Sequence, residues 1–337
     1  MLVVAIVGGG PAGCWAALQL ARAGINVQFI VGQRTAKAYD ETLSARATEL
    51  APYAAVVSGH KSGWGGPEIY ETAAMMSPWG GERLVSRPAL DLALQDCASN
   101  AGAAVVHGKV VQVKGAAGDW RLALDSGQEI GATIVVDATG RVRRIARRLG
   151  AARARRFDRL VGYPVRLRCT RDGRAEACTY VLSDREGWWF LGPGNDDHRY
   201  ALFFTDSDMA ARSCLGTIAA SWANIRDNLQ APAYLTQVMA PQLAHSEALD
   251  QPWGAGWLAI GDAAASFDPL SSSGLYFAKT SAEWASQAIQ DEDFRAFGDA
   301  VSDHVDAFLA SQRRVYWGER RFADYIFWQR RHGERVH

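Results

Sequence analysis

The sequence predicts an α/β fold in which a parallel sheet covered by helices is interleaved with an antiparallel sheet and followed by C-terminal helices. Two observations support this prediction. The chain begins with an apolar strand, a glycine-rich turn and a periodic helix, and two later segments again place small residues after an apolar strand. Between them, residues 161–204 form alternating, strand-like pieces. With 337 residues, the chain is long enough for one large domain or two interlocked ones.

The first predicted unit is a strand, a turn, a helix and a second strand. Its first strand is apolar on both faces, which is typical of a central parallel strand. In the turn, Gly8 permits the tight bend, Gly10 lets the backbone approach a pyrophosphate, and Gly13 lets the helix pack closely on the strand. The unit therefore predicts dinucleotide binding at the helix N-terminus. Its parts are strands over 2–7 and 27–31, the turn over 8–13 and a helix over 14–23.

One part of the dinucleotide-binding pattern is missing. An acidic residue normally ends the second strand and binds the adenosine ribose, but Val31 stands at that position. We therefore expect the ribose to be held in another way, with Gln33 and Arg34 as the nearest candidates.

Two later segments repeat the pattern of a buried strand that ends in a turn of small residues. The first is the strand up to Asp137, followed by Ala-Thr-Gly-Arg, and the second runs from Trp257 through Gly261-Asp262 to Pro269. The serine-rich turn 271–274 then leads into a helix predicted to continue to Ile289. A loop before a helix N-terminus offers backbone N–H groups to a ring carbonyl or a developing anion.

Three motifs together resemble those of the FAD-dependent monooxygenases of the glutathione-reductase-like fold, in the branch close to the tryptophan halogenases. The motifs are GGGPAG at 8–13, DATGR at 137–141 and GDAAASFDP at 261–269. Weaker matches lie at 40–43, 86–91 and 327–331, so the resemblance covers nearly the whole chain. We expect a Rossmann-like FAD-binding domain over 1–50, 85–160 and 251–295, a substrate domain over 51–84 and 161–250, and a C-terminal helical segment over 296–337.

The resemblance also implies which residues bind the cofactor. It puts the glycines of the first motif at the FAD pyrophosphate, Asp262 near the ribityl or pyrophosphate region, and residues 269–274 beside the isoalloxazine. The full expected set is Gly8, Gly10, Pro11, Ala12, Gly13, Arg34, Glu41, Arg87, Asp137, Gly140, Gly261, Asp262, Pro269, Ser272, Ser273 and Gly274.

Departures from the halogenase pattern favour hydroxylation over halogenation. Flavin halogenases carry a G-W-x-W-x-I-P run, but here Phe190 replaces the second Trp and Gly192 replaces the Ile. Halogenases also use a lysine to relay the hypohalous species. Lys61 is the one lysine near the substrate-side region, and it lies closer to Glu41 in the sequence than that pattern leads us to expect.

The middle of the chain is predicted to form a substrate-side layer. Strand-like pieces over 165–169, 178–182, 187–191 and 200–204 are followed by helices expected over 207–227 and 233–243. Trp64, Trp188, Trp189 and Phe190 are the expected substrate contacts, with Trp79 as a further aromatic of this region. Each could equally pack in the core, but as a group they favour a flat aromatic ligand.

His60 and Lys61 are the candidate catalytic residues. They lie in a glycine-rich stretch, 58–66, that is expected to be flexible and to face the flavin. A histidine there could serve as general base on a phenol or indole, because its ordinary pKa is close to neutral. The alternative is a histidine that is simply exposed on a loop.

The net charge is zero, with 36 basic and 36 acidic residues, but the charges are segregated. Residues 141–159 hold nine arginines and one acid, and residues 313–337 hold seven arginines and three acids. The first run is predicted to be a solvated helix face, or alternatively a surface for an anionic partner such as the phosphates of NAD(P)H or an acidic protein. Nucleic acid is disfavoured as a partner by the flavin motifs.

Cysteine usage and hydropathy indicate a cytoplasmic protein that contacts no membrane. The five cysteines form no CxxC pair and no metal-ligand spacing, so no metal is expected. No apolar run approaches the roughly 18 residues that span a bilayer, and the N-terminus lacks the basic region of a signal peptide.

The predicted function is that of an FAD-dependent monooxygenase that hydroxylates an aromatic ring through a flavin C4a-hydroperoxide, with O₂ as co-substrate. No second GxGxxG marks a nicotinamide domain, so electrons come from NAD(P)H that docks transiently or from a separate flavin reductase. The substrate is an aromatic small molecule or a Trp side chain of a partner polypeptide, since the branch includes flavoproteins that mature cysteine tryptophylquinone enzymes. Alternatives are a flavin-dependent halogenase in natural-product biosynthesis, an FAD-dependent reductase or dehydrogenase, and a non-catalytic flavin-binding assembly chaperone.

Overall fold

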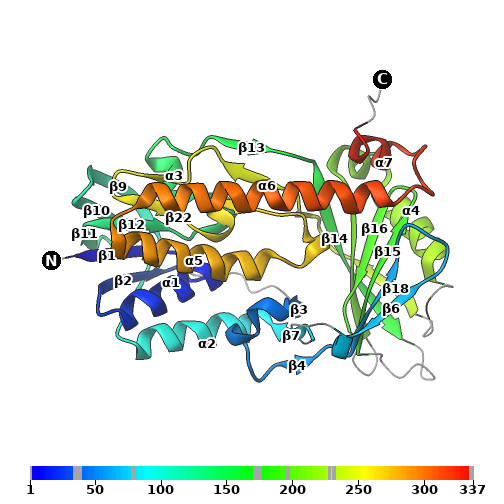
Figure 1. Ribbon diagram of the computed structural model, residues 1–337, viewed down its shortest axis with the longest axis horizontal. Coiled ribbons are helices and arrows are strands. Elements are labelled where there is room, and N and C mark those ends of the chain that lie inside the picture. The colour runs from blue at the N-terminus through cyan, green and yellow to red at the C-terminus, as the bar shows by residue number, and fades with distance from the viewer. Residues whose placement is uncertain are drawn as a thin grey trace.

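Two large sheets stand at opposite ends of the molecule, and one long helix runs along both of them (Figure 1). This long helix is α6 (Phe294–Gly318). The architecture is known from a computed structural model that describes residues 2–32, 40–76, 81–169, 177–193, 198–226, 229 and 233–333, with only the backbone at 210–214. The predicted fold class, an α/β domain interleaved with an antiparallel sheet and followed by C-terminal helices, is confirmed.

The first sheet has six strands in the order β21-β22-β12-β1-β2-β8, and all neighbours except β21 and β22 run parallel. Strand β1 is nearly fully buried, as its apolar sequence predicts. Helices α1, α2 and α5 lie side by side against this part of the molecule (Figure 1). The strands are β1 (Val3–Val7), β2 (Asn26–Val31), β8 (Ala104–His107), β12 (Ile134–Asp137), β21 (Trp253–Gly254) and β22 (Trp257–Ala259), and the helices are α1 (Pro11–Arg22), α2 (Arg87–Asn100) and α5 (Gly274–Asp291). A meander of β9 (Val110–Ala116), β10 (Asp119–Leu124) and β11 (Glu129–Ala132) packs beside β1 and β12.

The glycine-rich turn lets three backbone segments meet at the carboxyl end of β1. A Cβ on Gly8 would collide with the carbonyl oxygen of Ala138 after β12, and the φ of Gly8 is +124°, which L-residues rarely adopt. A Cβ on Gly13 would collide with the carbonyl oxygen of Gly8. The close packing of helix on strand that the sequence predicts at Gly13 is therefore present.

The second sheet follows the order β18-β14-β17-β16-β15-β5-β6, with β19 also paired to β14. All pairs are antiparallel except β5 with β15. The four predicted strands are present as β14 (Leu160–Cys169), β15 (Cys178–Asp184), β16 (Gly187–Leu191) and β17 (His198–Asp206), and the predicted helix as α4 (Ser207–Arg226). The additional strands are β5 (Gly59–Gly63), β6 (Tyr70–Ala73), β18 (Ala233–Val238) and β19 (Gln242–Leu243).

The helix predicted over 233–243 is wrong, because this segment forms β18 and β19. The segment pairs along the free edge of β14, with Val238 opposite Val165 and Leu243 opposite Val161. Hydrogen bonding to this edge satisfies the backbone groups of β14, and such a tertiary constraint outweighs local helical periodicity.

Shorter elements connect the two sheets. Strand β3 pairs with β7, which also pairs with β4, and this small sheet lies between the large ones (Figure 1). These elements are β3 (Asp40–Leu43), β4 (Ala55–Val56), β7 (Arg83–Ser86), β13 (Ala154–Arg156), β20 (Glu247–Leu249), β23 (Ala265–Ser266), α3 (Arg144–Arg148) and α7 (Ile326–Arg331). The short 3₁₀ segments are η1 (Ala45–Leu50), η2 (Ala74–Met76), η3 (Gly140–Val142), η4 (Gly261–Ala263) and η5 (Pro269–Ser271). The predicted domain boundaries stay a prediction.

The C-terminal segment is attached to the second sheet by buried charges. The Arg330 and Arg331 guanidinium groups both donate to the carboxylate of Asp206, at 2.7 and 2.9 Å, and Arg330 also binds Asp208. The indole of Trp328 donates to the carbonyl oxygen of Asp184 at 2.8 Å. Two of the seven arginines in the predicted basic tail are therefore bonded within the fold rather than free on its surface.

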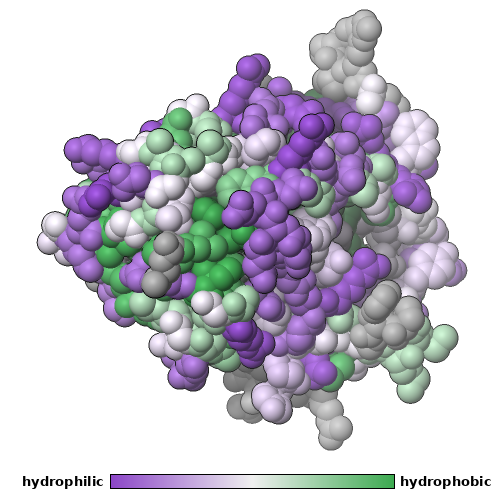
Figure 2. Space-filling model, turned by 60° about the vertical axis from the view of Figure 1, so that its left-hand side comes forward, coloured by the Kyte–Doolittle hydropathy of each residue, from purple (hydrophilic) through white to green (hydrophobic). Residues whose placement is uncertain are grey.

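Hydrophobic residues gather on the end of the molecule from which β1 starts, and hydrophilic residues surround them (Figure 2). Leu2, at this end, is 39% exposed. Among the helices of the described ranges, none combines the length and the apolar character needed to cross a bilayer.

We expect Gly13→Ala to lower the free energy of unfolding by about 2 kcal/mol or more, because the added methyl group must displace the backbone of Gly8. Urea titration measures this change. The matched control is Gly131→Ala, since a Cβ at Gly131 meets nothing within 4 Å. Equal stability of the two variants would contradict the close approach at Gly13.

Candidate functional site

A cavity of about 1260 Å³ lies between the carboxyl ends of the parallel strands and one face of the second sheet. One end is formed by the glycine-rich turn, α2 and the segment after β12. The other end is formed by Gly162, Phe190, Leu202 and Phe204 of the second sheet. A single cavity therefore connects the predicted nucleotide end to the predicted substrate layer.

The glycine-rich turn presents backbone to the cavity. Gly8, Gly10, Pro11 and Ala12 all line it, as predicted for cofactor contacts. Helix α1 begins here with Gly10 at its N-cap, which has no side chain to occupy the N–H groups of the first turn. The N-terminus of α1 therefore suits an anionic ligand.

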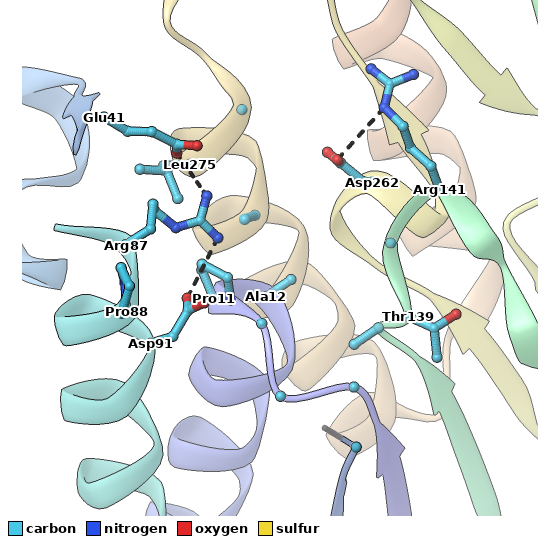
Figure 3. Close-up of a pocket in the computed structure, with 18 of the residues that line it drawn as sticks. Pro11, Ala12, Glu41, Arg87, Pro88, Asp91, Thr139, Arg141, Asp262 and Leu275 are labelled. Carbon is cyan, nitrogen blue, oxygen red and sulfur yellow. Dashed lines mark hydrogen bonds and ion pairs between the residues drawn. The ribbon is translucent and has the colours of Figure 1, made fainter. Parts of the chain in front are cut away.

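Glu41 and Arg87, which the sequence predicts from separate motifs, meet in the cavity wall (Figure 3). The guanidinium of Arg87 donates to the Glu41 carboxylate at 2.7 Å and contacts Asp91 at 3.5 Å. Arg87 is 8% exposed, and within the described part of the chain its Nε has no hydrogen-bond partner. A buried donor without a partner in the wall of a cavity is available to a water, an ion or a ligand acceptor that enters the cavity.

On the opposite wall, Arg141 reaches toward Asp262, with 3.9 Å between Nε and a carboxylate oxygen (Figure 3). Arg141 also donates to the carbonyl oxygen of His245 at 2.8 Å. Arg143 forms an ion pair with Glu247 at 2.9 Å and is 4% exposed.

The arginine run 141–159 was predicted to be a solvated helix face, and this prediction is wrong for the first residues of the run. Helix α3 has only five residues, and Arg143 before it adopts a left-handed conformation with φ +50° that turns its side chain into the interior. Arg144 lines the cavity, whereas Arg147 and Arg148 are exposed. The ion pair with Glu247 offsets the cost of burying Arg143.

Asp137 supports the cavity wall from behind rather than lining it. Its fully buried carboxylate accepts hydrogen bonds from the backbone and hydroxyl of Thr139 and from the N–H groups of Ile145 and Ala146, all at 2.6–3.0 Å. Burial raises the pKa of Asp137, and these donors oppose that shift. Because its carboxylate accepts four hydrogen bonds, Asp137 holds in place the segment that includes Thr139 and Gly140, both of which line the cavity.

The turn after β23 closes the cavity beside α5. Pro269, Ser272 and Gly274 line it, and Ser272 has a positive φ of +49°. Three other predicted cofactor residues do not line the cavity, although each is next in sequence to a residue that does: Gly13, Gly261 and Ser273. Arg34 lies outside the described residues, so its place in the site stays a prediction.

Of the predicted substrate residues, Phe190 alone lines the cavity. Trp188 is buried behind Phe204, with ring centroids 4.1 Å apart, and Trp189 donates to Ser221 of α4 at 2.8 Å. Trp64 donates to the carbonyl oxygen of Val315 at 2.9 Å. The structure uses these three tryptophans for packing, and Trp79 lies outside the described residues.

The expectation of a flexible stretch around His60 and Lys61 is wrong, because both residues lie within β5, paired on both sides. His60 Nδ1 lies 2.8 Å from the hydroxyl of Thr179, and burial lowers its pKa. Lys61 is 5% exposed and contacts Glu71 at 3.7 Å. Neither residue lines the cavity, so their catalytic roles stay predictions without support from the geometry.

Sequence reasoning missed several polar residues that line the cavity: Asp91, Gln95, His107, Lys109, Asp125, Arg144 and Gln242. For two of them, the spacing in the sequence could have indicated a place in the site. Asp91 and Gln95 follow Arg87 at intervals of four on α2, so the three share one helix face. Gln95 donates to the carbonyl oxygen of Gly9 at 3.1 Å and so contacts the glycine-rich turn directly.

Comparisons with known proteins agree with this geometry. The family model described as lycopene cyclase protein matches residues 3–172. The chain is 26% identical to "Putative FAD-dependent oxidoreductase LodB" of Marinomonas mediterranea, and the alignment of 367 positions covers 97% of this chain and 96% of that protein.

Solved structures of flavoproteins share the fold over the whole chain. The flavin-dependent halogenase CmlS superposes with a TM-score of 0.83 at 22% identity, over 99% of this chain and 68% of CmlS. QhpG, a peptidyl tryptophan dihydroxylase essential for tryptophylquinone cofactor biogenesis, superposes with a TM-score of 0.73 at 23% identity, over 97% of this chain and 78% of QhpG. The predicted resemblance to the halogenase-like flavoproteins is confirmed at the level of the fold.

We expect the ion pair at Glu247 to give stability that depends on pH. The imidazole of His245, whose Nε2 lies 3.3 Å from the carboxylate, and the charge of Arg143 lower the pKa of Glu247 to about 2. Because its pKa is depressed, the contribution is present above pH 4.5, its ordinary pKa, and is lost as the pH falls toward 2.

Glu247→Gln should therefore lower the free energy of unfolding by about 1–2 kcal/mol at neutral pH, with allowance for solvent screening, and by progressively less below pH 4.5. Urea unfolding at a series of pH values measures the difference. Glu68→Gln, at an exposed position, serves as control. A difference from wild type that stays constant with pH would refute this assignment.

Proposed function

Because the chain belongs to the lycopene cyclase protein family, an FAD-binding family, and has the fold of flavin-dependent halogenases, we propose that it is an FAD-dependent monooxygenase that hydroxylates an aromatic substrate. The observation that carries the proposal is the single cavity that connects the glycine-rich turn to an apolar face of the second sheet. A dinucleotide and an apolar substrate can meet in such a space.

The residues of the nucleotide end fit FAD. Gly8 and Gly10 would let the pyrophosphate approach the backbone, and the N-terminus of α1 would stabilise its charge. The free Nε of buried Arg87 would donate to the cofactor. When bound, FAD supplies the redox chemistry with O₂, and the protein supplies binding, orientation and exclusion of water.

The sheet end of the cavity fits a flat, apolar group. Phe190, Leu202 and Phe204 form the wall, and Gly162 allows the Phe204 ring to lie across β14, since a Cβ there would come within 2.6 Å of that ring. The wall contributes no charged side chain. It therefore favours an aromatic ring over a charged substrate and keeps water from the reacting atoms.

A Trp side chain of a partner polypeptide is the substrate that we favour. Two leucines that line the cavity are largely exposed, Leu92 at 60% and Leu243 at 61%, so the cavity opens to solvent on both the nucleotide and the sheet side. An open mouth accommodates a residue that is attached to a chain. The likeness to QhpG, which acts on peptidyl tryptophan, supports the same substrate class. A free aromatic small molecule is the alternative.

Halogenation is the second candidate, because CmlS has the same fold. One observation weighs against it. The relay lysine of halogenases would have to reach the substrate, but Lys61 lies inside β5 away from the cavity lining, and Lys109 is at the nucleotide end beside His107.

Electrons for the reaction come, in this proposal, from NAD(P)H or from a separate flavin reductase. The exposed Arg147 and Arg148 adjoin the cavity-lining Arg144 and would attract the phosphates or the acidic surface of such a donor.

We expect Arg87→Gln to raise the Kd for FAD by about tenfold to a hundredfold, because it removes charge-assisted donors from the cavity wall. Flavin absorbance after gel filtration and a fluorescence titration with FAD measure this. Arg295→Gln on α6, at a side chain 82% exposed, is the control. Wild-type protein that binds no FAD would rule out the proposed function.

We expect product only when O₂, FAD and a reductant are all present. The assay incubates the protein with a tryptophan-containing peptide or with free tryptophan and follows oxygen incorporation by mass spectrometry. Product from the peptide but not from free tryptophan supports the polypeptide substrate. Turnover without O₂ would point instead to a reductase or dehydrogenase, and halide incorporation would point to a halogenase.

Maturation of a partner enzyme, measured together with flavin retention, tests the assembly-chaperone alternative. If Asp262→Ala abolishes flavin retention yet leaves maturation of a partner enzyme intact, the flavin has no chemical role in that maturation.

A further inference from the structure

A buried chain of hydrogen bonds lies directly behind two walls of the cavity. The indole of Trp188 on β16 donates to the Tyr316 oxygen at 3.0 Å, and the Tyr316 hydroxyl on α6 donates to the Asp268 carboxylate at 2.6 Å. All three side chains are at most 2% exposed. None lines the cavity, but Phe267 and Pro269, on either side of Asp268, do.

Asp268 fixes the turn that follows it. One carboxylate oxygen accepts from the N–H of Leu270 at 2.9 Å, which caps η5. The other accepts from Tyr316 and from the amide of Gln312 at 3.0 Å. The backbone N–H of Asp268 donates to Ser246 at 3.0 Å. The start of the turn 269–274 is therefore set by donors that come from α6.

Trp188 connects this chain of hydrogen bonds to the substrate wall. Its ring stacks on Phe204, which lines the cavity, with centroids 4.1 Å apart. Phe190, two residues along β16, points to the same side of the sheet and also lines the cavity. One hydroxyl group thus bonds both to Asp268, which caps the turn that closes the cavity, and to Trp188, which packs against the aromatic wall of the substrate side.

We propose that Tyr316 is a positioning residue of the site, whose hydroxyl, bonded to Asp268 and Trp188, sets the turn 269–274 in register with the aromatic wall as long as Asp268 is ionised. The inference rests on the proposed FAD-binding function. It assigns a role to α6, which contributes no side chain to the cavity.

The ionisation state of Asp268 matters because the ionised carboxylate accepts from both Tyr316 and Gln312 at one oxygen, whereas protonation of that oxygen displaces a donor. Burial and the nearby carboxylate of Asp158 raise the pKa of Asp268 to about 6, while the donors and Arg331 oppose the shift. The Arg331 guanidinium lies 5.0 Å from the Tyr316 ring. The ring of His304 packs on Phe267, and burial lowers its pKa.

The test is the pH dependence of FAD affinity, measured by flavin fluorescence. For wild type, we expect the Kd to rise about tenfold as the pH falls through the titration of Asp268. In Tyr316→Phe, the ionised carboxylate loses a donor, so the transition moves to higher pH. In Asp268→Asn, it disappears. Gln312→Ala removes the other side-chain donor at a half-buried position and should shift the transition in the same direction if Tyr316→Phe does not fold.

Tyr325→Phe is the matched control, because it makes the same chemical change at a tyrosine that is 38% exposed, and its transition should equal that of wild type. A Tyr316→Phe or Gln312→Ala protein that melts earlier but keeps the wild-type transition would overturn the proposal, since a purely structural role changes stability alone. A wild-type Kd that is constant across this pH range would also overturn it. If wild type binds no FAD at any pH, the proposed function fails and this inference fails with it.

Discussion

The close approach of three backbone segments at the end of β1 is the constraint on which the rest of the site depends. The carbonyl of Ala138, the turn at Gly8 and the helix at Gly13 are so close that no Cβ fits at either glycine. This contact aims the N-terminus of α1 at the cavity and places the segment after β12 on its other side. The four hydrogen bonds to Asp137 then hold that second segment in place. The nucleotide end is thus formed by closely packed backbone, and the side chains of the site lie around it.

The sequence was sufficient for those parts of the fold that local chemistry determines. The glycine-rich turn, the strands at 134–137 and 257–259 and the four strands between 160 and 206 follow from apolar runs, alternation and small residues, and all are present. The segment 233–243 was wrongly predicted as a helix, because its strands exist only through pairing with β14, which lies more than 60 residues earlier in the sequence.

The site was predicted better at its backbone than at its side chains. Glu41 and Arg87 were found by motif and do meet, because Glu41 lies in β3 opposite Val85 of β7, and Arg87 begins α2 directly after β7. The tryptophans were misjudged for a general reason. A large aromatic side chain near a cavity can either line the cavity or pack behind the residues that line it. Only the three-dimensional structure shows that Phe190 lines the cavity whereas Trp188 packs against Phe204. Arg143 is a similar case, since its burial depends on a left-handed backbone conformation and on Glu247, about a hundred residues away.

The attachment of α7 to β17 also has a consequence for the order of folding during synthesis. Asp206 emerges from the ribosome more than a hundred residues before Arg330 and Arg331, which neutralise it. Strand β22 and the turn 269–274, which complete the parallel sheet and the cavity, are likewise synthesised late. Such long-range contacts slow folding, because the ends of a long loop must meet before the contact stabilises anything. The nascent chain therefore carries an open edge of β12 until β22 is made, and the carboxylate of Asp206 without its partners until α7 is made. Chaperone binding would benefit the chain most during this interval.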